Sequence, residues 1–139
     1  MKLILTATVL LVALLSSHSV VAQCLEYEPK VVRLSGVLRR ETYPGRPNYE
    51  SIKRGDEAET IWVLRLKKSI CVVTSSIDAA EVGEKNQKEI QLVLESAQYK
   101  RYRNLLRQKV IVSGTLFHWN IGHHHKPLLL TTLRMRKNL

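Results

Sequence analysis

Alternating apolar and polar positions predict five β-strands in this chain. The pattern is clearest at residues 31–40, where Val32, Leu34 and Leu38 share one face of the alternation. A period of two is typical of a strand with one buried face. Comparable runs predict the other strands at 61–67 with a continuation at 70–73, at 90–94, at 110–118 and at 128–135.

One segment has the spacing of a helix instead. Within residues 98–108, Tyr99, Tyr102, Leu105 and Leu106 recur three or four positions apart, and basic residues fill the positions between them. This spacing predicts one amphipathic helix between the third and fourth strands.

The resulting order is strand, strand, strand, helix, strand, strand, which is the layout of the OB-fold, a five-stranded Greek-key barrel. We therefore predict a mainly β protein, an OB-like Greek-key barrel with one helix between strands 3 and 4. Gly36 supports this prediction, because it interrupts the first strand, which must coil sharply to serve both halves of such a barrel. A β-sandwich would need more strands than the pattern provides.

The first 22 residues have the pattern of a cleaved secretory signal peptide. Lys2 gives a charged start, an apolar run follows to Leu15, and small residues lead to Ala22. The run is short for a membrane span and no second one follows, so we expect no membrane span after cleavage. Residues 23–139 are then expected to form one exported OB-like domain.

The charge of the chain favours acidic partners. Its formal net charge is +10, and the predicted leader holds only Lys2 of the basic residues, so the mature domain keeps nearly all of it. An exported basic protein is more suited to an anionic glycan, a lipid headgroup or an acidic protein than to nucleic acid, which we do not expect as a partner. The alternative is a solubilising charge with no partner.

Two cysteines, Cys24 and Cys71, lie in the predicted mature domain. In an oxidising compartment a pair of this kind predicts one structural disulfide, since the start of strand one and the end of strand two are neighbours in an antiparallel pair. A redox or metal-binding role is the alternative, although the pair lacks C-x-x-C spacing.

The histidines form an unusual cluster. His123, His124 and His125 are consecutive, and His118 precedes them by five residues. Imidazole is a common ligand of Zn, Cu and Ni, so His118, His123 and His125 are candidate metal ligands. A Zn, Cu or Ni ion is the only cofactor that the sequence suggests. The alternative is that one ring packs to order the loop between the last two strands while the others are solvated.

A second candidate segment lies in the predicted long loop of residues 41–60, which is rich in Pro and Gly. Two prolines restrict the segment from Tyr43 to Ser51. Arg46, Asn48 and Tyr49 are candidate ligand contacts there, since they offer a charge, an amide and a flat ring. The alternative is a self-packed loop that covers one end of the barrel.

Both candidate segments fall in the connections that flank one binding face of an OB-fold, so we predict that they meet. His123, His124 and His125 thereby join Arg46, Asn48 and Tyr49 as candidate ligand-binding residues. We predict no catalytic residue, because no nucleophile–base pair, phosphate-binding loop or paired carboxylates has a readable spacing. Three acids of the loop can lie near a histidine, but such acids are more often solvated: Asp56, Glu57 and Glu59.

The two segments resemble those of an uncharacterised family of short exported bacterial proteins. Residues 44–51 read Pro-Gly-Arg-Pro-Asn-Tyr-Glu-Ser, and residues 122–130 read Gly-His-His-His-Lys-Pro-Leu-Leu-Leu. Members of the family often carry threonine where this chain has Lys126. The resemblance implies export to the bacterial periplasm or secretion, and it implies no activity, substrate or cofactor.

The sequence thus favours a non-enzymatic binding module that recognises an anionic glycan or an acidic protein through the strand 1–2 and strand 4–5 loops. A divalent-metal-binding protein or metal-dependent hydrolase that uses the histidine loop is one alternative. A structural or interaction subunit with no small ligand is the other.

Overall fold

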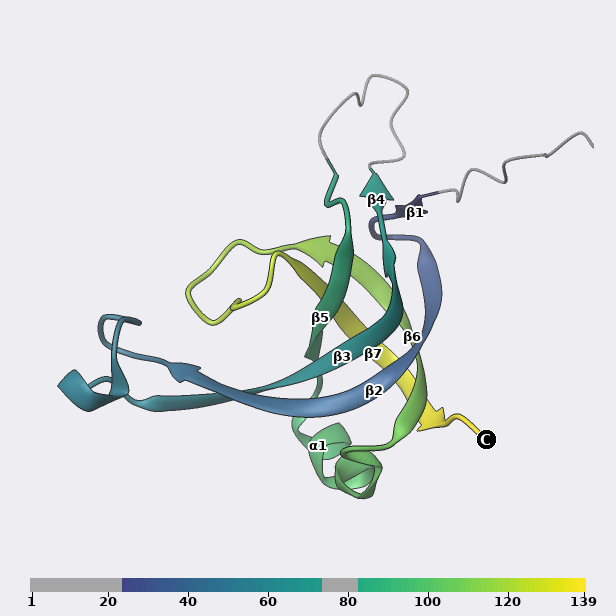
Figure 1. Ribbon diagram of the computed structural model, residues 1–139. Coiled ribbons are helices and arrows are strands. Elements are labelled where there is room, and N and C mark those ends of the chain that lie inside the picture. Colours follow the sequence, from purple (N-terminus) through teal and green to yellow (C-terminus); the bar gives the residue numbers. More distant parts are fainter. Residues whose placement is uncertain (1–23, 74–82) are drawn as a thin grey trace, which may run out of the picture.

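A closed five-stranded barrel forms the protein, as expected from the alternation. The structure, a computed structural model, describes residues 24–73 and 83–139, so the predicted signal peptide lies outside the described residues. The strands follow the order β2–β3–β5–β7–β6 around the barrel, and β6 pairs with β2 to close it (Figure 1). They are β2 (Val31–Pro44), β3 (Ala58–Ile70), β5 (Gln87–Val93), β6 (Lys109–His118) and β7 (Leu128–Lys137).

The strand order confirms the OB-like prediction. Within the barrel, all neighbouring strands are antiparallel except β5 and β7, which are parallel because the chain passes through a helix and β6 between them. That helix, α1 (Ser96–Tyr102), continues into the 3₁₀ turn η2 (Arg103–Leu105) and lies at one end of the barrel. The helix predicted at 98–108 therefore begins two residues earlier, at Ser96, because Glu95 and Gln98 cap its start reciprocally. Its helical turns end at Leu105.

Gly36 has the predicted role in coiling β2. Its position pairs with Leu66 of β3 and with Val110 of β6, so it is where the strand passes from one half of the barrel to the other. A Cβ atom at Gly36 would lie 2.5 Å from the carbonyl oxygen of Arg65. Gly114 of β6 is similarly confined, with Thr131 oxygen 2.1 Å from the position of such an atom. Only glycine allows the strands to approach this closely.

The apolar face of each strand fills the barrel. Leu38, Leu64, Ile90 and Leu116 are fully buried there, and Trp62 is buried as well. Residues of α1 and η2 close one end of this core, with Tyr102 buried and Leu105 and Leu106 packed against it. In the described ranges, no helix has the length and apolar character needed to cross a membrane.

Cys24 and Cys71 form the predicted disulfide, with their Cα atoms 4.7 Å apart. Its setting differs from the expectation, because the two cysteines precede the short strands β1 (Leu25–Glu26) and β4 (Val72–Val73), which pair in parallel outside the barrel. The bridge closes a separation of 47 residues, and the chain-entropy model assigns such a loop about 4 kcal/mol of stability.

The connection between β2 and β3 is shorter than predicted. Pairing continues to Tyr43 opposite Glu59 and Pro44 opposite Ala58, so the loop proper begins only at Gly45. This end of the hairpin extends beyond the barrel. Alternation fades there because neither face of the extension covers the core, and a strand without a buried face has no apolar period. The 3₁₀ turn η1 (Ile52–Arg54) lies within the loop.

Candidate functional site

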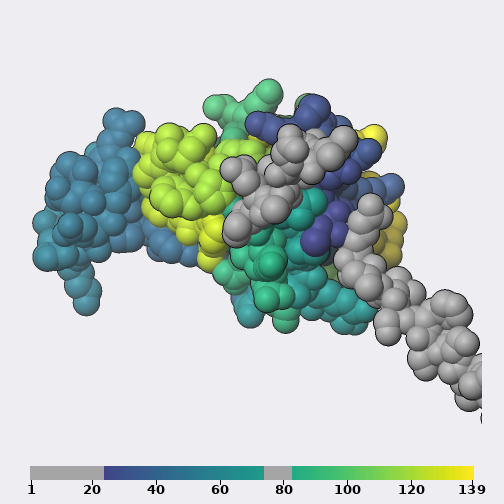
Figure 2. Space-filling view, turned by 90° about the horizontal axis from the view of Figure 1, so that it is seen from above, coloured from purple at the N-terminus to yellow at the C-terminus, as the bar shows by residue number. Residues whose placement is uncertain are grey.

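The two candidate segments meet in space. We call the end of the β2–β3 hairpin, residues 41–60, together with the β6–β7 loop, residues 119–127, the rim. Figure 2 shows the hairpin end (blue) against the β6–β7 loop (yellow-green). Gly122 lies on the ring of Tyr49, where an added Cβ atom would be 3.0 Å from the ring carbon Cζ. The rim is therefore one packed unit, built from parts of the chain that are far apart in sequence.

Glu59 is the centre of the rim. One carboxylate oxygen lies 2.5 Å from Nδ1 of His123, and the other lies 3.1 Å from Nε2 of His125. Burial opposes ionisation of Glu59, but the hydrogen bonds from His125 and His123 outweigh it and lower the pKa of its carboxyl. An ionised carboxylate only accepts hydrogen bonds, so each imidazole donates one. Glu59 thereby ties the hairpin to the β6–β7 loop.

Two tyrosines of the hairpin pack on the same histidines. Tyr43 stacks on His125 with ring centroids 4.6 Å apart and an interplanar angle of 9°. Tyr49 meets the His123 ring edge-on at 5.6 Å, with its hydroxyl 3.4 Å from Nε2. Since Nδ1 of His123 donates to Glu59, the Nε2 atom of a neutral His123 accepts a hydrogen bond from the Tyr49 hydroxyl. Both nitrogens of this ring are thus occupied within the protein.

Gln91 holds the backbone of the β6–β7 loop to the barrel. Its side-chain nitrogen donates to the carbonyl oxygen of His123 at 2.8 Å, and its side-chain oxygen accepts from the backbone N–H of His125 at 2.7 Å. Gln91 is buried. A buried amide with both ends satisfied fixes the orientation of the loop, because any other orientation would leave polar atoms unpaired.

Lys126 makes a second link between the loop and the hairpin. Its ammonium lies 2.9 Å from Glu41 and 2.7 Å from Glu89, and it faces the ring of Tyr43. Burial lowers the pKa of Lys126, but the hydrogen bonds to Glu89, Tyr43 and Glu41 outweigh burial and raise it. Lys126 is consequently always charged at physiological pH. The threonine that the resemblance suggests at this position could not reach two carboxylates in this way.

Asp56 shapes the tip of the hairpin. Its carboxylate accepts the backbone N–H groups of Asn48, Glu50 and Ser51 at 2.7 to 2.9 Å and also the Asn48 side chain at 3.2 Å. The backbone hydrogen bonds from Ser51, Asn48 and Glu50 lower the pKa of Asp56. Asn48 is therefore used to order the turn, while the side chain of Arg46 is exposed.

The other two histidines have separate environments. His124 accepts a hydrogen bond from the backbone N–H of Asn120 at 3.2 Å, and its ring meets Phe117 edge-on. Burial and the nearby His123 and His125 lower its pKa. His118, at the end of β6, bonds to Glu84. Among the described residues it shares no hydrogen bond with the other histidines.

The geometry limits the chemistry of the rim. A carboxylate bonded to an imidazole is the arrangement of a general base. The second nitrogen of His123, however, already contacts the Tyr49 hydroxyl, and the second nitrogen of His125 has no hydrogen bond to a hydroxyl or thiol among the described residues. Across residues 24–73 and 83–139, no group of three or more His, Cys, Asp or Glu side chains is placed to hold a metal ion. Zn, Cu or Ni binding stays a prediction.

A shallow cleft opens beside Glu59, between β3, β5 and the β6–β7 loop. It has a volume of about 180 Å³, and Gln91, Tyr99, His123 and His124 are among its lining residues. Pockets for small molecules are usually larger, about 300 Å³ or more. The exposed side chains of the β6–β7 loop, Trp119 at 50 % and Ile121 at 51 %, lie on the outer surface instead.

The sequence identified the two segments but missed the residues that join them. No motif or spacing marked Glu41, Glu89 or Gln91, and the loop position of Glu59 predicted a solvated side chain. Gln91 carried a usable signal, since it interrupts the otherwise apolar run from Ile90 to Leu94, where an amide needs a partner. The roles of Arg46, Asn48, Tyr49 and the histidines as ligand contacts stay predictions.

Fold and site together define a small disulfide-linked β-barrel whose two loops pack into one rim. Residues 89–135 match the family described as "Domain of unknown function (DUF4431)". The match covers β5 to β7 and includes the histidine segment at 122–130, but not the segment at 44–51. The expected similarity to an uncharacterised family is confirmed to that extent. No curated protein matches the chain.

Proposed function

We propose that this protein is an exported, non-enzymatic binding module that recognises an acidic protein through the rim. The observation that supports the proposal is the double hydrogen bond from His123 and His125 to Glu59, which fixes two distant loops in one arrangement. A surface that is ordered before binding loses less entropy when a partner docks. The disulfide between Cys24 and Cys71 agrees with an oxidising compartment.

The exposed residues of the rim favour a protein partner. Trp119 and Ile121 are about half exposed, Arg46 is exposed, and Tyr49 is partly exposed. Trp, Tyr and Arg are the side chains that most often dominate protein–protein binding energy. An anionic glycan is the alternative ligand of this same surface, with Trp119 and Tyr49 as stacking faces for sugar rings.

The proposal is tested by crosslinking and direct binding. A photo-crosslinking amino acid at Trp119 should capture a partner in the native compartment, whereas the same group at Leu133, an exposed residue of β7, should not. The captured protein is then purified and titrated with Arg46→Ala plus Trp119→Ala, which leave the Glu59 contacts in place. Affinity should fall by about tenfold or more. Unchanged affinity of the double variant would reject the rim as the binding surface.

Divalent-metal binding, whether for sequestration or for hydrolysis, is the second candidate function. The observation behind it is that His123 and His125 both contact Glu59, although the three side chains as placed do not form a metal site. A metal would have to replace the hydrogen bonds that now join these donors. Calorimetric titration with Zn²⁺, Cu²⁺ and Ni²⁺ separates the candidates: saturable binding that is lost in His123→Asn supports a metal, and heat of dilution alone excludes it.

A further inference from the structure

We propose that Arg39, Arg40, Arg103 and Arg107 form a binding groove for a glycan chain that carries phosphate or sulfate groups. The groove has a volume of about 780 Å³ and lies between β2 and the segment that follows α1. Val37 and Leu106 complete its lining. Its residues lie on other elements than the rim, and the inference does not depend on the function proposed for the rim.

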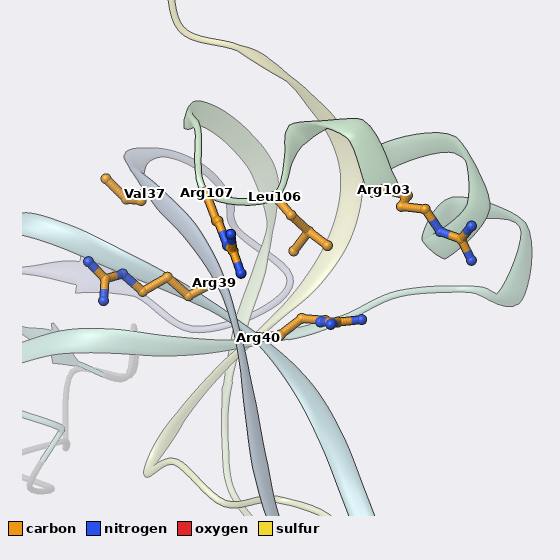
Figure 3. A pocket seen from close by; sticks show the side chains of 6 residues that line it. All are labelled: Val37, Arg39, Arg40, Arg103, Leu106 and Arg107. Atoms are coloured by element: carbon orange, nitrogen blue, oxygen red, sulfur yellow. The ribbon is translucent and has the colours of Figure 1, made fainter.

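Two different elements bring the arginines together. Arg39 and Arg40 are consecutive on β2, so their side chains diverge, as Figure 3 shows. Arg103 belongs to η2, and Arg107 follows it in the turn that enters β6. In Figure 3 the Arg107 side chain points towards β2. Side chains from β2 and from the segment that follows α1 thus line the same groove.

Among the described residues, no acid forms an ion pair with any of the four guanidinium groups. Within residues 24–73 and 83–139, none of them takes part in a salt bridge or a side-chain hydrogen bond, and all four residues are exposed. Glu41, the acid next to them on β2, is bonded to Lys126. Burial opposes ionisation of Glu41, and the charge of Arg39 acts on Glu41 only through space, where it helps to lower the pKa of that carboxyl. The chain from Ser96 to Leu139 contains no Asp and no Glu. Unpaired arginines gathered in a hollow create a local potential that attracts anions.

Arg107 is held in a conformation that its side chain does not favour. Its φ angle is 66°, in the left-handed region where Gly or Asn is more usual. The backbone fixes it there, since the N–H of Arg107 donates to the Leu38 carbonyl at 2.8 Å and the N–H of Leu38 donates to the Gln108 carbonyl at 3.0 Å. An arginine at a position better suited to glycine supports a use for its side chain.

The basic surface continues beyond the groove along the outer face of the barrel. A second hollow of about 220 Å³ is lined by Arg33, Arg134 and Arg136, with Ile111 and Ser113 between them. Pairing places Arg33 beside Ser113 and Ser113 beside Arg134, so these side chains form a row across three strands. Since residues of β2 line both basic hollows, the surface suits a chain with repeated charges better than a single ion.

The lining selects the kind of chain. Arginine binds the oxygens of phosphate and sulfate groups through paired N–H donors. Single-stranded nucleic acids bind to basic grooves in which aromatic rings stack on the bases. The groove contributes Val37 and Leu106 but no aromatic ring. A polyanion without bases, such as a sulfated or phosphorylated glycan, is therefore favoured over RNA or DNA.

The test compares two variants that remove the same charge from different places. The groove variant carries Arg39→Gln, Arg103→Gln and Arg107→Gly, and the rim variant carries Arg46→Gln, Lys53→Gln and Arg54→Gln. Binding of heparin, as the sulfated probe, is measured by fluorescence anisotropy over a range of salt concentrations. The groove variant should bind about tenfold more weakly or worse and show a smaller salt dependence, because fewer ionic contacts are formed. The rim variant should stay within about threefold of the parent.

Further probes distinguish the sources of the anion. Long-chain polyphosphate tests phosphate against sulfate, and tighter binding of either one identifies the preferred group. Equal losses in both variants would show attraction by net charge alone and would overturn the groove. Tighter binding of oligo-dT or polyglutamate than of heparin and polyphosphate would replace the glycan by a nucleic acid or an acidic protein. Circular dichroism and thermal unfolding of each variant verify that the barrel is intact.

Discussion

The rim and the arginine groove use charge in different ways. At the rim, Glu59 accepts from two histidines, Lys126 bridges two carboxylates and Asp56 accepts three backbone N–H groups. In the groove, none of the four arginines forms an ion pair or a side-chain hydrogen bond with a described residue. The rim has little apolar core of its own, so its paired charges take the place of apolar packing. The groove rests on the barrel core, so its charges are not needed for folding and are available to a ligand.

If paired charges stabilise the rim, the largest loss of stability is expected from Glu59→Ala. The change leaves His123 and His125 without their shared acceptor and releases the hairpin from the β6–β7 loop. We expect a loss of about 1–3 kcal/mol in the free energy of unfolding, measured by urea denaturation. Glu57→Ala is the matched control, since that neighbouring side chain is exposed. Equal stability of the two variants would mean that the rim does not depend on its paired charges.

A smaller loss is expected from Gly122→Ala. The new methyl group would lie 3.0 Å from the Tyr49 ring and displace it from His123. Overpacking of this kind costs about 1 kcal/mol. In a double-mutant cycle with Tyr49→Ala, the cost of the added methyl should largely disappear, because the ring is gone. Additive effects of the two changes would show that the Tyr49–Gly122 contact does not hold the loops together.

The stability of the rim should also depend on acid pH. The hydrogen bonds from His125 and His123 hold the folded-state pKa of Glu59 below its ordinary value of 4.5. A carboxyl with a lowered pKa stabilises the fold fully above the unfolded value, and this contribution is lost as the pH falls through the folded value. The thermal unfolding temperature, measured between pH 7 and pH 3, should therefore fall below about pH 4.5. The fall should be smaller in Glu59→Gln. A parallel course of both proteins would contradict the assignment.

The smallest effects on stability are expected in the groove. Arg39→Gln and Arg103→Gln should each change the free energy of unfolding by no more than about 0.5 kcal/mol, as for other exposed residues without partners. Arg107→Gly should leave it unchanged or raise it by up to about 1 kcal/mol, because glycine accepts the left-handed backbone. A loss above about 1 kcal/mol in any of the three, measured by urea denaturation, would show that the groove has a structural role.

The barrel was predictable because the burial of each strand is visible in its pattern of apolar and polar residues. Each has one face on the core, so alternation at residues 31–40 and the glycine within that strand were sufficient to place β2 and its sharp coil. The hairpin end at 41–44 and 58–60 has no buried face and was interpreted as loop. The parallel pairing of β1 and β4 was missed because each strand has only two residues, too few to show a period.

The rim was only partly predictable. The unusual segments at 44–51 and 122–130 marked it, and the OB-like strand order predicted that they meet. Sequence spacing gave no means of finding that Glu59 lies between His123 and His125, since 64 and 66 residues separate the partners. The groove was harder to recognise, because exposed arginines on a strand are typical of any solvated face. Only the return of the chain after α1 places Arg103 and Arg107 opposite Arg39.

The central claim is that the groove arginines are available to a ligand while the rim charges are used within the protein. It is tested most directly by an NMR titration of the ¹⁵N-labelled protein with a heparin oligosaccharide of defined length. We expect the largest amide shift changes around Arg39, Arg103 and Arg107, with residues 45–57 and 119–127 nearly unaffected. Shift changes concentrated in those two loops, with the segment around Arg107 unperturbed, would contradict this claim.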